Sequence, residues 1–140
     1  MSEDNSGSKI GENQIVGNIG LYYVCYELSK LRWNVLPTSR NARGVDLVIY
    51  SRDAKRMHTI QVKTLSKRNP VPFGNKPSLI ADYLIICRVC EKPEVFVTKI
   101  DSELGKRIEK KTKDDKVSYW LQPKNYEEFR ENWGVIGKGS

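Results

Sequence analysis

The most continuous apolar run of the chain, DYLIICRV at residues 82–89, places the strongest constraint on the fold. A run of this length and composition is typical of a central strand that has neighbouring strands on both sides. Further runs of strand length follow from the same criterion, at residues 33–38, 45–50, 58–64, 94–100 and 117–122. The sequence therefore predicts a sheet of about four to six strands.

Three segments carry helical signals. Apolar residues recur at helical intervals over residues 14–31, which predicts a helix packed against the sheet. A second, short helix is expected over about 102–110, with Asp101 or Ser102 as its N-cap. The segment PKNYEEFRENW at residues 123–133 is expected to form a closing helix with proline near its start.

The remaining segments lack apolar periodicity. Residues 65–80 contain three prolines and a glycine and are expected to form a long loop, and KKTKDDK at residues 110–116 is interpreted as a charged connection. Residues 1–13 are expected to form a flexible polar tail. The order of helices and strands predicts one α/β domain over residues 14–140, with a mixed sheet flanked by helices.

Composition limits the class of protein. The chain has 140 residues, of which 39% are hydrophobic and 29% charged, as expected for one globular domain with a substantial core. No stretch approaches the ~20 apolar residues of a membrane span, so no membrane partner is expected. The N-terminal residues are polar and do not resemble a secretory signal, and we therefore expect a cytoplasmic location.

The chain has three cysteines, which we expect to be reduced thiols. Cys87 and Cys90 form a CxxC, but they lie in a predicted strand, where side chains three residues apart point to opposite faces. Because a zinc site needs about four ligands and only Cys25 and His58 remain, ordinary thiols are the favoured interpretation.

Positive charge is concentrated in one part of the chain. The formal net charge is +7, and the segment from Lys30 to Arg68 alone contains ten Lys or Arg against two Asp. Such a concentration favours a polyanionic partner, because neutralising phosphates releases counterions. A solvated basic surface is the alternative. The basic run 106–116 contains three acidic residues and is interpreted as such a solvated surface.

Three polar side chains interrupt two neighbouring predicted strands. Asp46 enters one apolar run, and Gln61 and Lys63 lie near the end of the next, on the same face of their strand. If the two strands pair through the turn SRDAKR at residues 51–56, the three groups converge at one edge of the sheet. Carboxylate and amide oxygens suit Mg²⁺ or Mn²⁺, and a lysine can hold an attacking water or stabilise charge on a phosphate. The set therefore suits hydrolysis of a phosphodiester by a metal-held water.

The motif GVDLVIY…IQVKT, preceded by an amphipathic helix and a strand, resembles the PD-(D/E)XK nuclease superfamily. The likeness is to its restriction-endonuclease-like and archaeal Holliday-junction-resolvase-like branches, and it covers roughly residues 17–64. It implies a restriction-endonuclease-like fold in which Asp46 and Gln61 bind the metal ion and Lys63 supports the nucleophilic water. Gln61 corresponds to the variant with an amide in place of the second acid.

The sequence departs from this pattern at two positions. Val45 stands where the motif has proline, and Leu21 stands where many members have a helical glutamate. Glu27, two turns later and on the helix face of Leu28, is the remaining candidate for this catalytic carboxylate. Its alternative is a helix glutamate at the solvent boundary.

Each member of the candidate site has a structural alternative. Asp46 and Lys63 could form an ion pair at the strand ends, and Gln61 taken alone would be a cross-strand hydrogen bonder. An amide at position 61 also weakens divalent-metal affinity relative to an acid. A member of the fold that binds nucleic acid without cleaving it is therefore an open alternative.

We expect a divalent-metal-dependent nuclease that acts on DNA, with RNA left open as a substrate and a homodimer possible because cutting both strands commonly needs two sites. The alternatives are a non-catalytic nucleic-acid-binding module and an interaction domain with an incidental basic surface. The tyrosines at positions 22, 23 and 26 are interpreted as core rather than base-stacking residues. Phosphate contacts are expected from residues in the flanking loops, namely Ser39, Arg40, Asn41, Arg43, Lys67 and Arg68.

Overall fold

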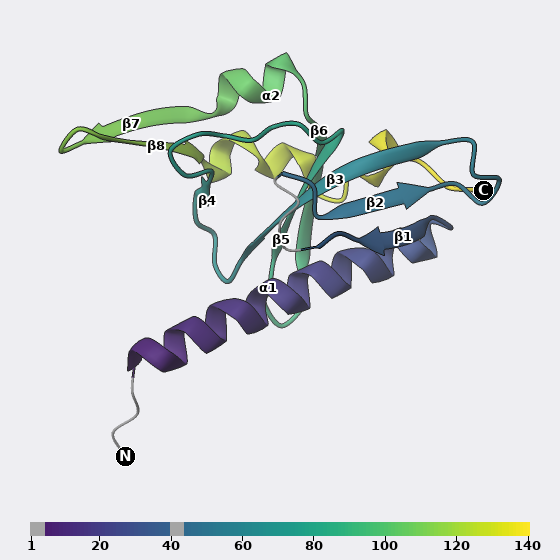
Figure 1. Cartoon of the computed structure of the whole chain (residues 1–140), viewed down its shortest axis with the longest axis horizontal. Coiled ribbons are helices and arrows are strands. Elements are labelled where there is room, and N and C mark those ends of the chain that lie inside the picture. The colour runs from purple at the N-terminus through teal and green to yellow at the C-terminus, as the bar shows by residue number, and fades with distance from the viewer. Residues whose placement is uncertain (1–4, 40–43) are drawn as a thin grey trace.

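The computed structural model describes residues 5–39 and 44–140, with side chains from residue 12 onward (Figure 1). The elements are α1 (Asn5–Lys30), β1 (Asn34–Pro37), β2 (Leu47–Tyr50), β3 (Met57–Leu65), β4 (Val71–Pro72), β5 (Tyr83–Arg88), β6 (Glu94–Lys99), α2 (Ser102–Arg107), β7 (Glu109–Lys113), β8 (Lys116–Leu121), and the 3-10 turns η1 (Pro123–Asn125), η2 (Glu127–Phe129) and η3 (Trp133–Val135).

The main sheet has five strands in the order β1-β2-β3-β5-β6. β1, β2 and β3 form an antiparallel meander, β3 pairs with β5 in parallel, and β5 pairs with β6 in antiparallel. All six residues of β5 are buried, as the apolar run predicted for a central strand. The prediction of an α/β domain with a mixed sheet is confirmed.

Helix α1 covers one face of this sheet. Its residues Val24 and Leu28 are fully buried in a core shared with Ile49, Ile60 and Ile85. α1 begins nine residues before the predicted start at Gln14, so residues 5–13 are helical rather than a tail. Figure 1 shows that this first part of α1 extends beyond the edge of the sheet. Because no core lies opposite those turns, no apolar periodicity marks them in the sequence.

The other face of the sheet is covered mainly by a second, three-stranded sheet of order β4-β8-β7, together with α2 and the 3-10 turns η1 and η2 (Figure 1). Leu84 and Ile86 of β5 point into this second core, where they meet Leu121 and Tyr126. η3 packs on the α1 side instead. Helices therefore lie on both faces, but on the second face the short α2 is secondary to the three-stranded sheet.

Two predicted segments differ from the structure. The charged connection 110–116 is part of a hairpin in which β7 pairs with β8, and Asp114 and Asp115 turn the chain with φ of 51° and 61°. Two residues of positive φ are the ordinary requirement of a tight hairpin turn. The closing segment is a series of 3-10 turns rather than a helix, interrupted at Glu131 with φ of 51°.

The long loop 65–80 contains the short strand β4, whose residue Val71 pairs with Leu121 of β8. The short helix α2 agrees with the prediction, since the Asp101 carboxylate accepts a hydrogen bond from the Leu104 N–H as its N-cap. Over residues 5–39 and 44–140, α1 and α2 both lack the apolar length needed to cross a bilayer.

Candidate active site

Asp46 lies at the residue before β2, where the pairing of β2 with β3 ends. Its N–H donates to the Ile60 carbonyl at 2.8 Å, and its own carbonyl accepts from the Thr38 N–H at 2.9 Å. Its carboxylate Oδ2 accepts from the Val62 N–H at 2.7 Å. This charge-assisted hydrogen bond replaces the next bond of the strand ladder and fixes the carboxylate against β3.

Val62, whose N–H binds the Asp46 carboxylate, stands between Gln61 and Lys63 in the sequence, so Asp46 adjoins this part of β3. Strand alternation directs Val62 to the α1 side of the sheet and the other two side chains to the opposite side. There, Gln61 is in register with Leu84 of β5, and Lys63 is in register with Ile86. Asp46 therefore adjoins the part of β3 that carries Gln61 and Lys63, as expected for neighbouring strands, but these two residues lie inside β3 (Met57–Leu65) rather than at its end.

Gln61 is almost completely enclosed. Its exposed fraction is 6%, and its side-chain Oε1 has no hydrogen-bond partner among the described residues. A buried polar atom without a partner costs about 1–3 kcal/mol relative to a satisfied one, and such atoms are rare unless a water or an ion completes them. The amide oxygen therefore has a free acceptor capacity that a water or a cation would satisfy.

Lys63 is half-buried, and its ammonium Nζ lies 5.1 Å from the centroid of the Phe73 ring. Burial lowers the pKa of Lys63, and the nearby Asp46 charge opposes this shift without cancelling it. A lysine of lowered pKa releases its proton more readily, which suits a group that handles the proton of a water.

The donor set available to a cation is small. It consists of one carboxylate (Asp46), one amide oxygen (Gln61) and nearby backbone carbonyls, all hard oxygen ligands. No group of three or more His, Cys, Asp or Glu side chains that could hold a metal occurs in the described part of the chain. Mg²⁺ commonly binds through one or two protein oxygens and completes its octahedron with water and substrate phosphate, so this set is sufficient in kind.

Glu27 is not part of this site. It lies on α1, which covers the face of the sheet opposite to Gln61 and Lys63. Its carboxylate pairs with Lys30 at 3.2 Å and lies beside Tyr23, whose pKa is raised to about 12 by burial and by Glu27. The alternative of a glutamate at the solvent boundary is therefore the better description of Glu27.

The predicted phosphate contacts are only partly described. Ser39 and Lys67 are exposed beside the sheet end, whereas Arg40, Asn41 and Arg43 lie outside the described residues. Arg68 is not a free cation, because its guanidinium donates to both carboxylate oxygens of Glu127, at 2.6 and 3.2 Å.

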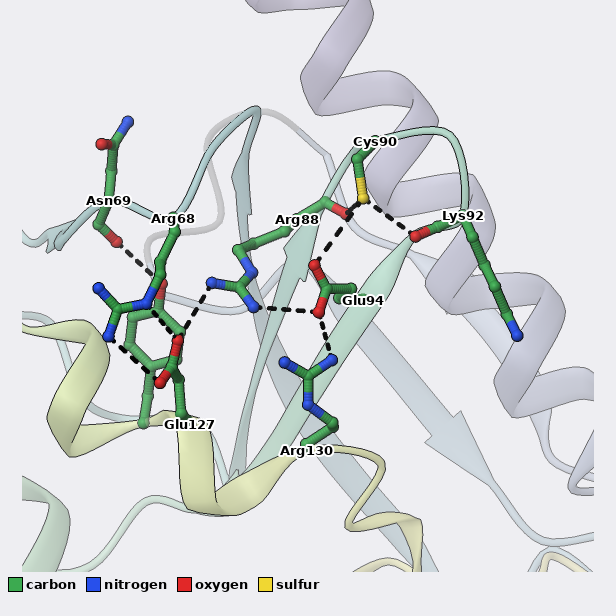
Figure 2. A network of polar contacts seen from close by, with 9 residues as sticks. Arg68, Asn69, Arg88, Cys90, Lys92, Glu94, Glu127 and Arg130 are labelled. Atoms are coloured by element: carbon green, nitrogen blue, oxygen red, sulfur yellow. Dashed lines mark hydrogen bonds and ion pairs between the residues drawn. The ribbon is translucent and has the colours of Figure 1, made fainter.

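Arg68 belongs to a network of alternating charges that sequence reasoning did not identify (Figure 2). Arg88, at the end of β5, bridges Glu127 at 3.4 Å and Glu94 at 3.1 Å, and Arg130 also pairs with Glu94. Arg88 is 5% exposed and stands in register with Leu65 of β3, on the face that carries Lys63. The available signal was an arginine inside the buried run LIICRVC, which requires partners from elsewhere in the chain.

The cysteines lie near this network but do not form a common site. Cys87 is buried in the core beneath α1, and burial raises its pKa to about 12. Cys90 is exposed and lies 4.0 Å from the Glu94 carboxylate. A surface pocket of about 260 Å³ opens here, lined by Ser66, Lys67, Arg68, Arg88, Cys90 and Glu94.

Comparison of the chain with models of known families, with curated proteins and with solved structures gives no match. The function must therefore be inferred from the residues at the end of the β2–β3 pair and from their chemistry.

Proposed function

We propose that the chain is a divalent-metal-dependent nuclease of the PD-(D/E)XK superfamily, which hydrolyses phosphodiester bonds of DNA at Asp46, Gln61 and Lys63. The observation that carries the proposal is the buried amide oxygen of Gln61, which has no partner among the described residues. It belongs to the residue next to Val62, whose N–H holds the Asp46 carboxylate. A cation between the two oxygens would satisfy both groups.

Each residue has a distinct role in this proposal. Asp46 supplies the charged ligand; its Oδ2 accepts the hydrogen bond from the Val62 N–H, and its other oxygen, Oδ1, would bind the cation. Gln61 supplies a neutral oxygen from a rigid, buried position. Mg²⁺ or Mn²⁺, when bound, would acidify a water and neutralise charge on the phosphate. Lys63 would orient that water and stabilise the developing negative charge.

The arrangement of elements supports the superfamily assignment. A helix, a strand and a β-hairpin precede the central strand, and the hairpin carries Asp46 at the start of one strand and Gln61-x-Lys63 on the other. This order matches what the resemblance implies for a restriction-endonuclease-like domain. The positive charge of the segment 30–68 supports a polyanionic substrate.

Manganese titration by calorimetry tests the metal site, and cleavage of plasmid and branched DNA tests the activity. Asp46→Asn keeps an oxygen for the Val62 N–H but removes the charge, so it should abolish cleavage and weaken manganese binding about tenfold or more. The matched control is Asp53→Asn, an exposed aspartate at the other end of the same hairpin, which should leave both measurements unchanged.

A second pair of variants examines the lysine. Lys63→Met keeps an unbranched side chain on Phe73 and should abolish cleavage while manganese binding is retained. Lys55→Met, at an exposed lysine in the turn between β2 and β3, should retain most of the cleavage. Retention of cleavage in Asp46→Asn or Lys63→Met would contradict the nuclease proposal.

A nucleic-acid-binding module that does not cleave is the second candidate. It is favoured by the single carboxylate of the donor set, since Glu27 lies on the other side of the sheet. In that case the protein would bind DNA with a steep salt dependence, while manganese would neither bind nor promote cleavage. An interaction domain with an incidental basic surface would show no such DNA binding.

A further inference from the structure

The outward face of α1 carries a stripe of exposed apolar side chains. Ile15, Ile19, Tyr22 and Tyr26 are 56%, 46%, 64% and 59% exposed, respectively. Their spacing of four, three and four residues places them on one side of the helix, in the repeat typical of a helix–helix seam. The opposite side of α1, which includes Val24, is buried on the sheet. α1 therefore has two apolar faces, of which only one is covered by residues that the structure describes.

The stripe is also free of charge. No charged residue occurs from Asn13 to Tyr26, although the chain carries a formal net charge of +7. Contiguous exposed apolar surface of this kind marks an interaction site in a soluble protein. Because the centre of the stripe carries no charge and charged side chains occur only at its ends, it suits a partner whose surface is equally apolar at its centre.

We infer that this partner is a second copy of the chain, packed through α1 in an antiparallel pair about a two-fold axis. Helical spacing then brings Ile15 of one copy opposite Tyr26 of the other, and Ile19 opposite Tyr22, so that each layer combines one aliphatic and one aromatic side chain. The same surface serves both copies, as a two-fold interface requires.

Charge complementarity at the ends of the stripe selects the antiparallel arrangement. Glu12, three residues before Ile15, is exposed on the continuation of the stripe. At the other end the Lys30 side chain is 53% exposed; it pairs with Glu27 at 3.2 Å, and its Nζ lies 4.9 Å from the Tyr26 ring centroid. In the antiparallel pair Glu12 of one copy approaches Lys30 of the other. A parallel pair would instead place Glu12 beside Glu12 and Lys30 beside Lys30, which is unfavourable.

The position of α1 permits this contact. Figure 1 shows α1 at the periphery of the molecule, with most of the sheets on one side of it and the turn between β5 and β6 extending past it. The exposed side chains of the stripe lie on the side of α1 opposite to Val24 and Leu28, which are buried on the sheet. Asp46, Gln61 and Lys63 lie away from the stripe, since Gln61 and Lys63 point to the opposite side of the main sheet, so the inference does not depend on the proposed nuclease activity.

Sedimentation velocity over a range of protein concentrations tests the inference. The wild-type chain should shift from monomer to dimer as concentration rises. Ile19→Glu and Tyr22→Glu each place a charge in the centre of the seam and should raise the dissociation constant at least tenfold, with an unchanged circular dichroism spectrum. The matched control is Met57→Glu, since Met57 is 64% exposed but lies on β3, and this variant should dimerise like the wild type.

Cysteine cross-linking tests the orientation, in a background in which Cys25 and Cys90 are replaced by serine. Mixed Ile15→Cys and Tyr26→Cys proteins should form a disulfide-linked heterodimer, whereas Ile15→Cys alone should form little dimer.

A wild-type chain that stays monomeric at every concentration overturns the inference, and so does dimerisation that survives Ile19→Glu and Tyr22→Glu. Efficient cross-linking of Ile15→Cys to itself overturns the antiparallel arrangement. If the wild type is monomeric and the Tyr22→Glu variant loses DNA binding, the stripe is a nucleic-acid surface instead.

Discussion

At the scale of single residues, Gln61 carries an unsatisfied buried polar atom. Its Oε1 is buried and, like Arg88 Nε, finds no hydrogen-bond partner among the described residues. A purely structural glutamine would be expected to have its oxygen hydrogen-bonded across the strands. The side chain therefore provides a direct test of whether the position serves the fold or a ligand.

Substitutions of Gln61 should separate stability from metal binding. Gln61→Leu removes the unsatisfied oxygen, so the free energy of unfolding should hold or rise by about 1 kcal/mol, while manganese affinity falls about tenfold or more. Gln61→Glu places a second buried carboxylate beside Asp46 and should lower the melting temperature without metal, but manganese should raise it more than in the wild type. Thermal melts with and without manganese measure both effects. Unchanged manganese binding in Gln61→Leu would remove this residue from the site.

Lys63 gives a prediction about pH. Because burial holds its folded-state pKa below the unfolded value, the unfolded chain binds more protons between the two pKa values. Stability contributed by this group should therefore rise as pH increases through that alkaline window. Lys63→Met should be at least as stable as the wild type at neutral pH and should lack this alkaline rise. Urea unfolding at a series of pH values compares the stability of the wild type with that of Lys63→Met. A marked loss of stability in Lys63→Met would instead indicate a structural ion pair between Lys63 and Asp46.

The sequence predicted that Gln61 and Lys63 share one face of their strand, because alternation along a strand specifies which side chains share a face. It failed for Glu27, because helical periodicity indicates the buried side of a helix but not which face of the sheet that helix covers. It failed for Arg68 because the carboxylate that binds it, Glu127, is distant in the sequence. Contacts between remote segments leave no local pattern.

At the scale of elements, α1 and β3 approach closely at one point. A Cβ built on Gly20 would lie 2.2 Å from the Thr64 Cγ2 methyl and 3.1 Å from its Cβ, closer than real contacts allow. The absence of a side chain at Gly20 therefore sets the distance between α1 and the sheet.

Gly20→Ala should destabilise the protein by about 1–3 kcal/mol, despite the higher helix propensity of alanine. Thr64→Ser removes the methyl that would clash, so the double variant should recover most of the loss. Gly105→Ala in α2 is the control, because no atom lies within 4 Å of its added Cβ, and it should be neutral or stabilising. Chemical denaturation of the four variants gives the comparison. If the changes in unfolding free energy of Gly20→Ala and Thr64→Ser simply add in the double variant, the close contact is contradicted.

The charge network fixes the closing segment to the end of β5 and should make it sensitive to acid. Hydrogen bonds from Arg130 lower the pKa of Glu94, and those from Arg68 lower the pKa of Glu127. The stability that these two ionised glutamates contribute is present above the ordinary glutamate pKa of 4.5. It should be lost as the pH falls through their lower folded-state pKa values. Hydrogen exchange of residues 123–136 should therefore accelerate below that pH before exchange of the main sheet does.

Within this network the buried arginine should matter most. Arg88→Ala removes the bridge between two carboxylates and should cost about 2–3 kcal/mol, because the remaining groups lose a partner inside the protein. Arg68→Ala, whose side chain is 60% exposed, should cost less than about 1 kcal/mol. The unfolding free energies of Arg88→Ala and Arg68→Ala give the comparison. Equal losses of stability in the two variants would show that burial of Arg88 has no energetic consequence.

The elements themselves were predictable where apolar side chains alternate or repeat. All five strands of the main sheet correspond to predicted runs. β7 was missed because four of its five residues are exposed and most are charged, so it lacks the half-buried pattern of a strand. The closing 3-10 turns were missed because the spacing of Tyr126 and Phe129 also fits a helix, and the interruption at Glu131 is specified by tertiary contacts.

At the scale of the whole molecule, the two faces of the main sheet serve different purposes in our proposals. One face presents Gln61 and Lys63 beside Asp46, and the other is covered by α1, whose outer stripe is assigned to a second copy. An active site and an association surface on opposite sides would allow each to be altered separately. Ile19→Glu should therefore leave manganese binding unchanged, which calorimetry can check alongside sedimentation.

The parallel pairing of β3 with β5 has a kinetic consequence. Unlike a hairpin, this pair forms only when the loop of residues 66–82 brings the two strands together. The conformational entropy of this loop must therefore be lost before the central contacts form. Doubling that connection with a Gly/Ser insertion between the exposed Asn75 and Lys76 should slow refolding about threefold, since doubling a loop adds about 0.6 kcal/mol. The unfolding rate should be nearly unchanged. In stopped-flow tryptophan fluorescence, an insertion that instead accelerates unfolding would mean that the connection closes after the rate-limiting step.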